Sequence, residues 1–287
     1  MASLSKRLAT NANGDFYVDS TCIDCGTCRW MAPESFDRVG EKSRIHNQPE
    51  NETQTLRALK ALVACPTASI GTEQPSHVKS VAAGFPDLIE DNVYHCGYHH
   101  PDSFGAASYF IVRPEGNVLV DSPRFSGPLV KRFEELGGID LIFFTHRDDV
   151  AEHEKFAKHF GCTRVLHADD VSASTNTIEQ QPGRIEPVQL ANDLLMIPVP
   201  GHTRGSACLL YGEKYLFSGD HLAWSPELNH LIAFRNACWF DWETQIESMR
   251  RLALYDFEHV LPGHGAPCHL DARKMRNEMS ACVEWME

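Results

Sequence analysis

The sequence predicts an α+β protein that consists of a small N-terminal domain and a larger C-terminal domain. Regularly spaced cysteines occupy the first part of the chain, and a stretch containing Pro75, Gly84 and Pro86 follows. Beyond it, short apolar runs alternate with helix-compatible runs. We therefore place the small domain at residues 1–75, a linker at 76–90 and the large domain at 91–287.

The amino-acid composition indicates which kinds of partner and which cellular compartment to expect. The chain has 287 residues, of which 43% are hydrophobic, and its net charge is −13. Such an acidic chain disfavours nucleic acid and anionic membranes as partners, and we expect a small-molecule substrate instead. No long apolar run and no signal-like start is present, so we expect a cytoplasmic protein. In a reducing compartment, the ten cysteines favour metal binding or free thiols over disulfides.

The N-terminal cysteines are spaced for a metal cluster. Cys22, Cys25 and Cys28 lie three positions apart, with Gly26 between them to relax the loop, and Cys65 precedes Pro66. A helix predicted at 53–64 would bring Cys65 back to the other three thiols. A zinc site and unrelated thiols are the alternatives, although structural zinc is usually bound by two separate cysteine pairs.

This pattern resembles a ferredoxin with a single cluster. In two-cluster bacterial ferredoxins, Cys and Pro follow such a triplet at once, and that Cys binds the other cluster. Here the corresponding slot holds Ala32 and Pro33, and no second triplet exists. The resemblance covers residues 14–73 and implies one [4Fe–4S] cluster, bound by the following residues: Cys22, Cys25, Cys28 and Cys65.

The large domain alternates predicted strands and helices. Apolar runs predict strands at 108–112, 117–121, 139–144, 164–167, 214–217 and 259–261, and another that begins at Leu194. Amphipathic runs predict helices at 128–136, 150–160, 243–254 and 272–284. The histidine-rich segment 92–109 is expected to serve packing or the surface, and the aromatic residues of 239–242 are expected to pack in the core.

Polar side chains follow several of these strands at the point where the strand ends. His146 follows the strand predicted at 139–144, and His202, Asp220 and His264 follow later apolar runs in the same way. Open α/β sheets bind ligands at the carboxyl ends of their strands. Because the same kind of terminus recurs, the sequence predicts a metal site rather than isolated polar strand ends.

The order of these motifs resembles the metallo-β-lactamase superfamily over residues 91–270. The His146 turn is followed by Pro-Gly-His-Thr-Arg-Gly-Ser at 200–206, Ser-Gly-Asp at 218–220 and Pro-Gly-His-Gly at 262–265. The resemblance implies an αββα sandwich with one or two metal ions at one edge of the paired sheets. It also implies that His146 and His202 bind the first metal, that Asp220 bridges and that His264 belongs to the second.

One motif departs from that family. The common pattern His-x-His-x-Asp-His, counted from His146, places Asp148 in the second His slot and leaves Val150 and Ala151 in the last two. Asp149 and His153 are four residues apart, so they would share one face of a helix that begins near Asp149. We therefore expect Asp148, Asp149 and His153 to be candidate ligands.

The carboxylate in that slot changes the expected chemistry. His146, Asp148 and His202 form a set of two His and one carboxylate, which is typical of non-haem Fe(II) sites, although zinc also accepts such ligands. The flavodiiron branch of the superfamily likewise has a carboxylate there and binds redox-active iron. This chain has no flavodoxin-like domain, and its own cluster would be the electron carrier.

These features support two hypotheses in which the protein is an enzyme and one in which it is not. In the first, an oxidoreductase exchanges electrons between the cluster and an iron site; lacking a nucleotide-binding glycine fingerprint, it needs an external electron-transfer partner. In the second, a zinc or iron hydrolase resembles the glyoxalase II-like thioesterases, and the cluster is a sensor or a brace. Asp148 and Asp220 are the expected catalytic residues. The third hypothesis is a regulatory iron–sulfur protein without catalysis.

Overall fold

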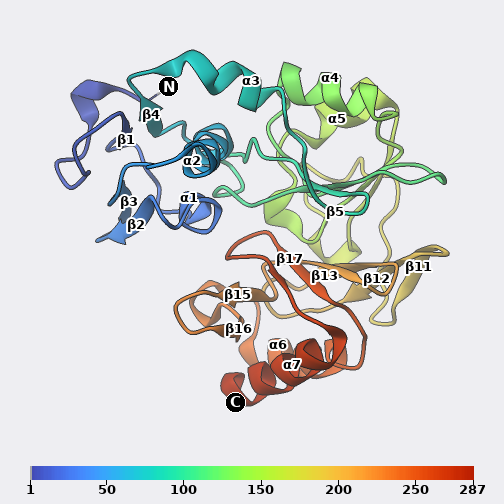
Figure 1. The fold of residues 1–287 in the computed structure, drawn as a ribbon. Helices are drawn as coiled ribbons and strands as arrows, with labels where there is room; N and C mark the ends of the chain where they lie inside the picture. The colour runs from blue at the N-terminus through green and yellow to red at the C-terminus, as the bar shows by residue number, and fades with distance from the viewer. Residues whose placement is uncertain (1) are drawn as a thin grey trace.

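The computed structural model describes residues 2–287. A small domain, which contains β1 to β4, lies beside a larger sandwich of two sheets (Figure 1). In the same view, α4 and α5 lie at the top of the sandwich, and α6 and α7 lie at the bottom. Among the described residues, no helix combines the length and the apolar composition needed to cross a membrane.

The small domain consists of two antiparallel sheets of two strands each, β1 with β4 and β2 with β3, together with two α-helices and one 3₁₀ helix. Its elements are η1 (Leu4–Lys6), β1 (Phe16–Val18), α1 (Thr27–Met31), β2 (Phe36–Val39), β3 (Lys42–Ile45), α2 (Glu52–Ala64) and β4 (Ile70–Thr72). The predicted helix at 53–64 is therefore present as α2. It begins where the Asn51 side chain accepts a hydrogen bond from the Gln54 amide, at 3.0 Å. Its apolar face buries Leu59 against Phe16 and Phe36.

The first sheet of the sandwich has six strands in the order β10-β9-β8-β7-β6-β5. Their bounds are β5 (Asp87–Glu90), β6 (Val93–His95), β7 (Tyr109–Ile111), β8 (Val118–Val120), β9 (Leu141–Phe143) and β10 (Thr163–Val165). Strand β9 is parallel to both of its neighbours, and the other pairs are antiparallel. The central strands are buried on both faces, which explains their continuous apolar runs.

The second sheet also has six strands, in the order β11-β12-β13-β14-β17-β18. Their bounds are β11 (Val188–Ala191), β12 (Leu194–Pro198), β13 (Ala207–Tyr211), β14 (Tyr215–Gly219), β17 (His259–Pro262) and β18 (Cys268–His269). Strands β14 and β17 are parallel. A separate hairpin, β15 (Ala223–Ser225) with β16 (His230–Ile232), stands beside this sheet.

Helices cover the outer faces of both sheets, which gives the predicted αββα order. The core between the sheets includes Phe143 and Phe217. Helices α4 (Gly127–Glu135) and α5 (His153–Phe160) pack on the first sheet through Phe133 and Phe156. Helices α6 (Trp242–Leu252) and α7 (Ala272–Met286) pack on the second sheet. The remaining short helices are η2 (Pro75–His77), α3 (Val78–Ala82), η3 (Arg147–Asp149), η4 (Ala168–Asp170) and η5 (Arg235–Ala237).

Three expectations differ from the structure. Residues 76–90, which we expected to be a linker, contain α3 and the edge strand β5. The helix expected at 150–160 begins only at His153, because the preceding turn η3 is a 3₁₀ turn and Glu152 adopts a left-handed conformation with φ 53°. Trp239 and Phe240, expected in the core, are 61% and 41% exposed.

Candidate iron–sulfur site and metal centre

The structure brings the N-terminal cysteines to one small cavity. Its lining includes the side chains expected to bind a cluster: Cys22, Cys25, Cys28 and Cys65. All ten cysteines of the described chain are free. Cys65 reaches the cavity because it immediately follows the last turn of α2, and Gly26, with φ 85°, turns the loop into α1.

The surroundings of these sulfurs suit an iron–sulfur cluster. Backbone amides approach two of them: the Ser43 amide lies 3.4 Å from Cys22 Sγ, and the Ser69 amide lies 3.2 Å from Cys65 Sγ. Amide hydrogen bonds to sulfur are one way in which proteins tune such clusters. Burial raises the pKa of the Cys25 and Cys28 thiols, so a cation must share the cavity if both sulfurs are to be thiolates.

The candidate metal centre lies where four strands of the sandwich end. His146 follows β9, His202 follows β12, Asp220 follows β14 and His264 follows β17. His146 Nε2 lies 3.9 Å from Asp148 Oδ2 and 3.8 Å from Asp220 Oδ2. His202 Nε2 lies 3.7 Å from each of the same two oxygens. The donors of His146, Asp148 and His202 therefore converge on a common point, and Asp220 lies beside both imidazoles.

Buried atoms without partners show that the residues fit a metal ion. His146 Nε2, both ring nitrogens of His202 and both carboxylate oxygens of Asp149 are buried and have no hydrogen-bond partner within residues 2–287. Unpartnered buried polar atoms are costly, so they are retained where a ligand satisfies them. His146, Asp148 and His202 offer donor atoms within 4.8 Å of one another, and so do His146, Asp149 and Asp220.

Several carboxylates in this region need a positive charge. Burial, followed by the charges of Asp220 and Asp121, raises the pKa of Asp149 well above its usual range. Burial also raises the pKa of Asp121 to about 8. Although burial opposes it, the neighbouring His264 lowers the pKa of Asp220. A cation among these groups would relieve their mutual repulsion.

The structure separates two of the expected ligands from the donor sets. His153 Nδ1 lies 2.9 Å from Arg164 Nη1, so the expectation that His153 joins the metal centre is wrong. The physical reason is the start of α5: Asp149 belongs to η3 and does not share a helix face with His153. His264 donates from Nδ1 to Asp220 at 2.9 Å and belongs to neither three-donor group among the described residues.

Two aspartates that the sequence analysis did not single out hold the ligands in place. Asp121 accepts hydrogen bonds from the Thr145 amide at 2.8 Å and from its hydroxyl at 3.0 Å, and that hydroxyl contacts His146 Nδ1 at 3.0 Å. Asp170 accepts from the Arg147 amide at 3.0 Å and from the Thr203 hydroxyl at 2.6 Å. Each lies at or beyond the end of a buried strand, which is the signal that could have found them.

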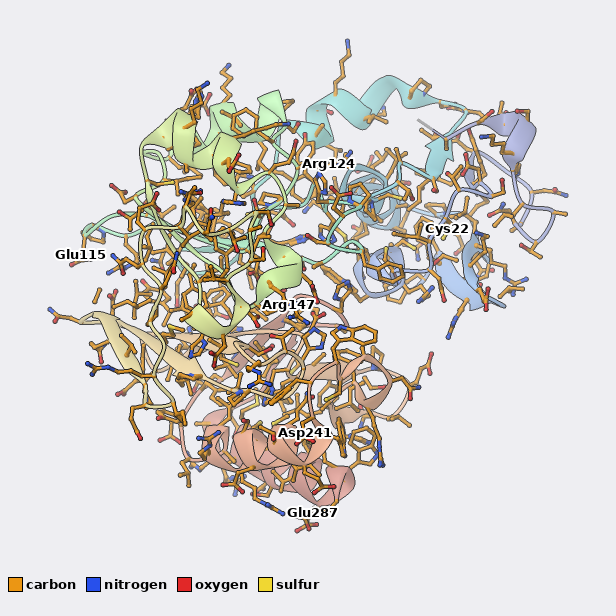
Figure 2. The ribbon with its side chains drawn as sticks, turned by 180° about the vertical axis from the view of Figure 1, so that it is seen from behind. Cys22, Glu115, Arg124, Arg147, Asp241 and Glu287 are labelled. Atoms are coloured by element: carbon orange, nitrogen blue, oxygen red, sulfur yellow. The ribbon has the colours of Figure 1, made fainter. Side chains whose placement is uncertain are left out.

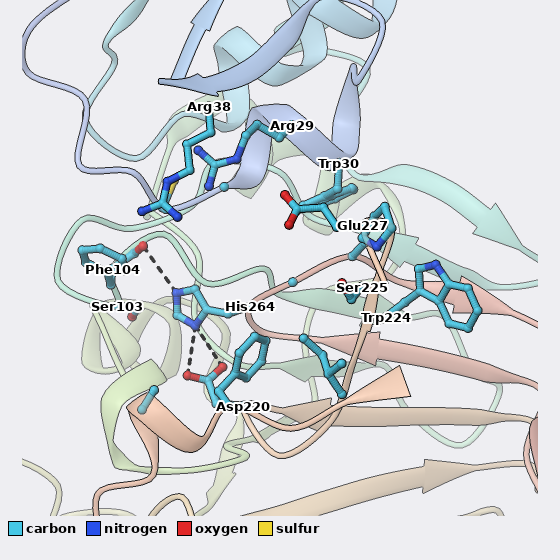
Figure 3. A pocket seen from close by; sticks show the side chains of 18 of the residues that line it. Arg29, Trp30, Arg38, Ser103, Phe104, Asp220, Trp224, Ser225, Glu227 and His264 are labelled. Atoms are coloured by element: carbon cyan, nitrogen blue, oxygen red, sulfur yellow. Dashed lines mark hydrogen bonds and ion pairs between the residues drawn. The ribbon is translucent and has the colours of Figure 1, made fainter. Parts of the chain in front are cut away.

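A pocket of about 990 Å³ opens over the metal centre (Figure 3). Its lining from the sandwich includes Asp148, His202 and Asp220, and its lining from the small domain includes Cys25 and Arg29. The pocket therefore lies between the two candidate cofactor sites.

One short segment links the two sites directly. A Cβ placed on Gly105 would lie 3.1 Å from Cys25 Sγ, so the backbone passes close to that sulfur. The adjacent Phe104 carbonyl accepts a hydrogen bond from His264 Nε2 at 3.4 Å, and His264 in turn donates to Asp220. A series of contacts therefore connects Cys25 to Asp220 through residues 104–105 and His264.

A ferredoxin-type cysteine site joined to an αββα sandwich with a His/Asp metal centre defines the class of protein. Residues 91–283 match the model for the metallo-beta-lactamase superfamily, and the chain belongs to that superfamily. Residues 18–72 match the model for the 4Fe-4S single cluster domain of Ferredoxin I. No curated protein matches this sequence.

Solved structures with the same fold are similar to the sandwich domain. A metallo-beta-lactamase from Pontibacter korlensis is 17% identical with a TM-score of 0.53, covering 70% of this chain and 97% of that one. The BLEG-1 B3 metallo-beta-lactamase is 16% identical with a TM-score of 0.52, covering 68% and 99%. VMB-1 is 17% identical with a TM-score of 0.51, covering 69% and 95%. At these identities the likeness establishes the fold.

Proposed function

We propose that this protein is an oxidoreductase in which electrons pass between a [4Fe–4S] cluster in the small domain and a non-haem iron ion in the sandwich. One observation carries the proposal: Cys25 of the cysteine site lines the same pocket as Asp148 and His202 of the metal centre. A cluster that served only as a brace would not need a ligand in the wall of the substrate pocket.

The donor set supports iron as the metal. His146 and His202 with the Asp148 carboxylate form two imidazoles and one carboxylate around one point, and this set leaves coordination positions open. When bound, the cluster and the iron would supply one-electron chemistry, and an external partner would supply or accept the electrons. Asp148 and Asp220 both line the pocket, so we propose that they contact the substrate as well as the ion.

The pocket walls favour a small molecule with an apolar body and a negative group. Aromatic side chains line it and would exclude water: Phe104, Trp224, Phe234 and Trp239. Arg29 and Arg38 lie on the small-domain side and share the carboxylate of Asp24, at 2.5 and 2.7 Å (Figure 3). Two guanidinium groups paired with one carboxylate make a positive patch on this wall, which attracts an anionic group, whereas Asp102 and Glu227 place negative charge elsewhere in the lining.

The proposal is tested by counting metals in protein purified without oxygen and recording EPR spectra before and after dithionite. The expected result is more iron than one cluster accounts for, with a second iron signal that changes on reduction. The Cys65→Ser variant should lose the cluster's visible absorbance and retain the second iron. Zinc in the sandwich domain, with no iron outside the cluster, would reject the redox function.

A second candidate function is metal-dependent hydrolysis of an ester or a thioester. It is favoured by the buried carboxylates of Asp149 and Asp220, which lie beside one another and could hold a second ion: a Cβ on Gly263 would lie within 3.0 Å of both. A metal pair lowers the pKa of bound water and polarises a carbonyl group. Turnover of a model thioester by the zinc-loaded protein, unchanged by reduction of the cluster, would select this function instead.

A further inference from the structure

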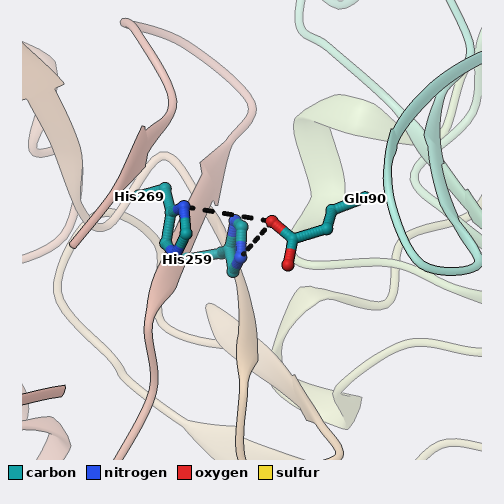
Figure 4. A group of neighbouring side chains, drawn as sticks. All are labelled: Glu90, His259 and His269. Carbon is teal, nitrogen blue, oxygen red and sulfur yellow. Dashed lines mark ion pairs between the residues drawn. The ribbon is translucent and has the colours of Figure 1, made fainter. Parts of the chain in front are cut away.

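A second group of metal-ligating side chains lies away from the centre described above. Glu90 ends β5 at the edge of the first sheet, while His259 begins β17 and His269 ends β18 in the second sheet (Figure 4). His259 and His269 are paired across the two strands. His264 lies five residues beyond His259, so this group is roughly 16 Å from the metal centre, at the other end of β17.

The three side chains converge on one point. Each offers one ligand atom, and the three atoms lie within 4.8 Å of one another. Glu90 Oε2 lies 3.4 Å from His259 Nε2 and 3.9 Å from His269 Nδ1. The two imidazole rings are stacked, with centroids 4.0 Å apart.

His259 supplies an independent sign of a ligand. Its side chain is 4% exposed, and its Nε2 is buried without a hydrogen-bond partner anywhere in residues 2–287. Burial, with a contribution from His269, lowers the pKa of His259 to about 4, so the ring is neutral at pH 7. A neutral imidazole has the free lone pair that a metal requires.

The surrounding charges also favour a cation. Lys214 Nζ lies 2.7 Å from Glu90 Oε1 and 2.8 Å from Asp91 Oδ2, which leaves Glu90 Oε2 to face the imidazoles. The hydrogen bond from Lys214 lowers the pKa of Glu90, so this group is a carboxylate. One ammonium group against two carboxylates leaves a net charge of about −1 beside the two neutral rings.

We propose that Glu90, His259 and His269 form a separate site for a divalent transition-metal cation such as Zn²⁺. Two imidazoles and a carboxylate are a common zinc ligand set, with water in the fourth position, and such a set disfavours Mg²⁺ and Ca²⁺. The ion connects the edge strand of the first sheet to β17 and β18 of the second. Since the unfolded chain lacks the site, bound Zn²⁺ stabilises the folded sandwich.

The test is Zn²⁺ uptake by the full-length protein, purified anaerobically with its own metals. After equilibration with Zn²⁺ and removal of the excess, wild type should retain one more zinc per chain than His269→Ala. The His269 side chain is 52% exposed, so its loss should not prevent folding. Glu90→Gln, which keeps the shape of the side chain, should behave like His269→Ala.

His159→Ala is the matched control. His159 is a half-exposed histidine on α5 that pairs with Glu134 at 2.8 Å and has no second imidazole on that carboxylate. This variant should retain the wild-type zinc content. Added Zn²⁺ should raise the melting temperature of this variant and of wild type by the same several degrees. Equal zinc content and equal melting shifts in wild type and His269→Ala would overturn the proposal, whatever metal the main centre binds.

Discussion

The side chain at position 148 distinguishes the two proposed chemistries, because a carboxylate there favours iron and an imidazole favours zinc. The imidazoles of His146 and His202 are almost fully buried, whereas the Asp148 side chain is 48% exposed at the mouth of the pocket. Its carboxylate therefore reaches both the common donor point and the substrate space. The neighbouring imidazole of His202, 3.7 Å away, lowers the pKa of Asp148, so this group contributes negative charge to the centre.

Asp148→His should change the metal that the sandwich domain retains. The substitution restores the second His of the common superfamily motif and replaces an oxygen ligand with a nitrogen ligand, and sites rich in imidazole suit zinc. We expect the ratio of zinc to non-cluster iron to rise several-fold, as measured by metal analysis of protein grown with both metals. Asp256→His is the control, because Asp256 is exposed and forms an ion pair with Arg276 away from the metal centre. Equal metal ratios in the two variants would show that Asp148 is not a ligand.

Some residues of the metal centre could be predicted from the sequence, and others could not. His146, His202 and Asp220 could be predicted because each lies within four residues of the end of an apolar strand. His153 was wrongly expected because the helix start depends on a 3₁₀ turn, which leaves no periodic signal. Glu90, His259 and His269 converge only through the pairing of β17 with β18 and the packing of two sheets, so their spacing in the sequence carries no motif.

At the scale of elements, the segment between β6 and β7 is the link between the domains. Residues 92–109, which contain this segment, were expected to serve packing or the surface. In the structure, His99 is buried and contacts the Gly105 carbonyl at 2.7 Å, and Thr27 of α1 also donates to that carbonyl at 3.3 Å. This fixes the turn at 104–105 against the cysteine loop.

Gly105→Ala should disturb the cysteine site. Gly105 has φ +84°, and a Cβ there would lie 2.8 Å from Pro66 Cγ and 3.0 Å from Cys25 Cβ. The combined strain is about 1–3 kcal/mol, so the cysteine loop should shift and the cluster should be lost faster in air. The measurement is the decay of visible absorbance over time.

Gly127→Ala is the control for that variant. A Cβ on Gly127 would meet no atom within 4 Å, and the residue begins helix α4, where alanine is favourable. Its cluster should decay at the wild-type rate. If Gly105→Ala also decayed at that rate, the close approach of residues 104–105 to Cys25 would have no influence on the cluster.

Edge strand β5 could not be predicted from the sequence pattern. Leu88 and Ile89 are 54% and 37% exposed, so the strand lacks the alternation that marks a half-buried strand. Pairing with β6 alone makes it a strand. The αββα order, in contrast, was predicted from the resemblance of the His- and Asp-bearing motifs to the metallo-β-lactamase superfamily, whereas the periodic patterns predicted only that strands and helices alternate.

At the scale of the whole molecule, a buried histidine at the junction of the domains should make stability depend on pH. His95 packs against Trp30 of the small domain and Tyr109 of the sandwich, with ring centroids 5.3 and 6.0 Å apart. Burial lowers the pKa of His95 from 6.5 to about 3. Below pH 6.5 the unfolded chain therefore binds a proton that the folded chain does not.

The free energy of unfolding should consequently fall as the pH is lowered from about 6.5 towards 5, by at most about 1.4 kcal/mol per pH unit for this residue. The measurement is the melting temperature between pH 8 and pH 5. His95→Phe, which keeps a ring and removes the titration, should show a shallower decline even if its stability at pH 8 is lower. Parallel curves for the two proteins would exclude His95 as the source.

Contacts across the domain boundary place the cysteine site against the sandwich. Arg124, in the connection from β8 to α4, lies between the small domain and the sandwich (Figure 2). Its Nη2 donates to the Val63 carbonyl at 2.9 Å and to the Cys65 carbonyl at 3.4 Å. These are carbonyls at the C-terminal end of α2, which a helix leaves without internal partners. A residue of the sandwich thus completes the helix that carries the fourth cysteine.

Arg124→Ala should loosen this docking and expose the cluster. Removing a charged donor from partly buried carbonyls costs about 1–3 kcal/mol, which raises the population of the opened junction by roughly 5- to 150-fold. Cluster absorbance should then decay several-fold faster in the presence of an iron chelator. Arg132→Ala removes the same charge from the exposed face of α4, where Arg132 pairs with Glu135, and should leave the decay unchanged. Equal decay in both variants would mean that Arg124 does not hold the domains together, and that the remaining contacts, among them the Lys60–Asp87 pair at 2.7 Å, suffice.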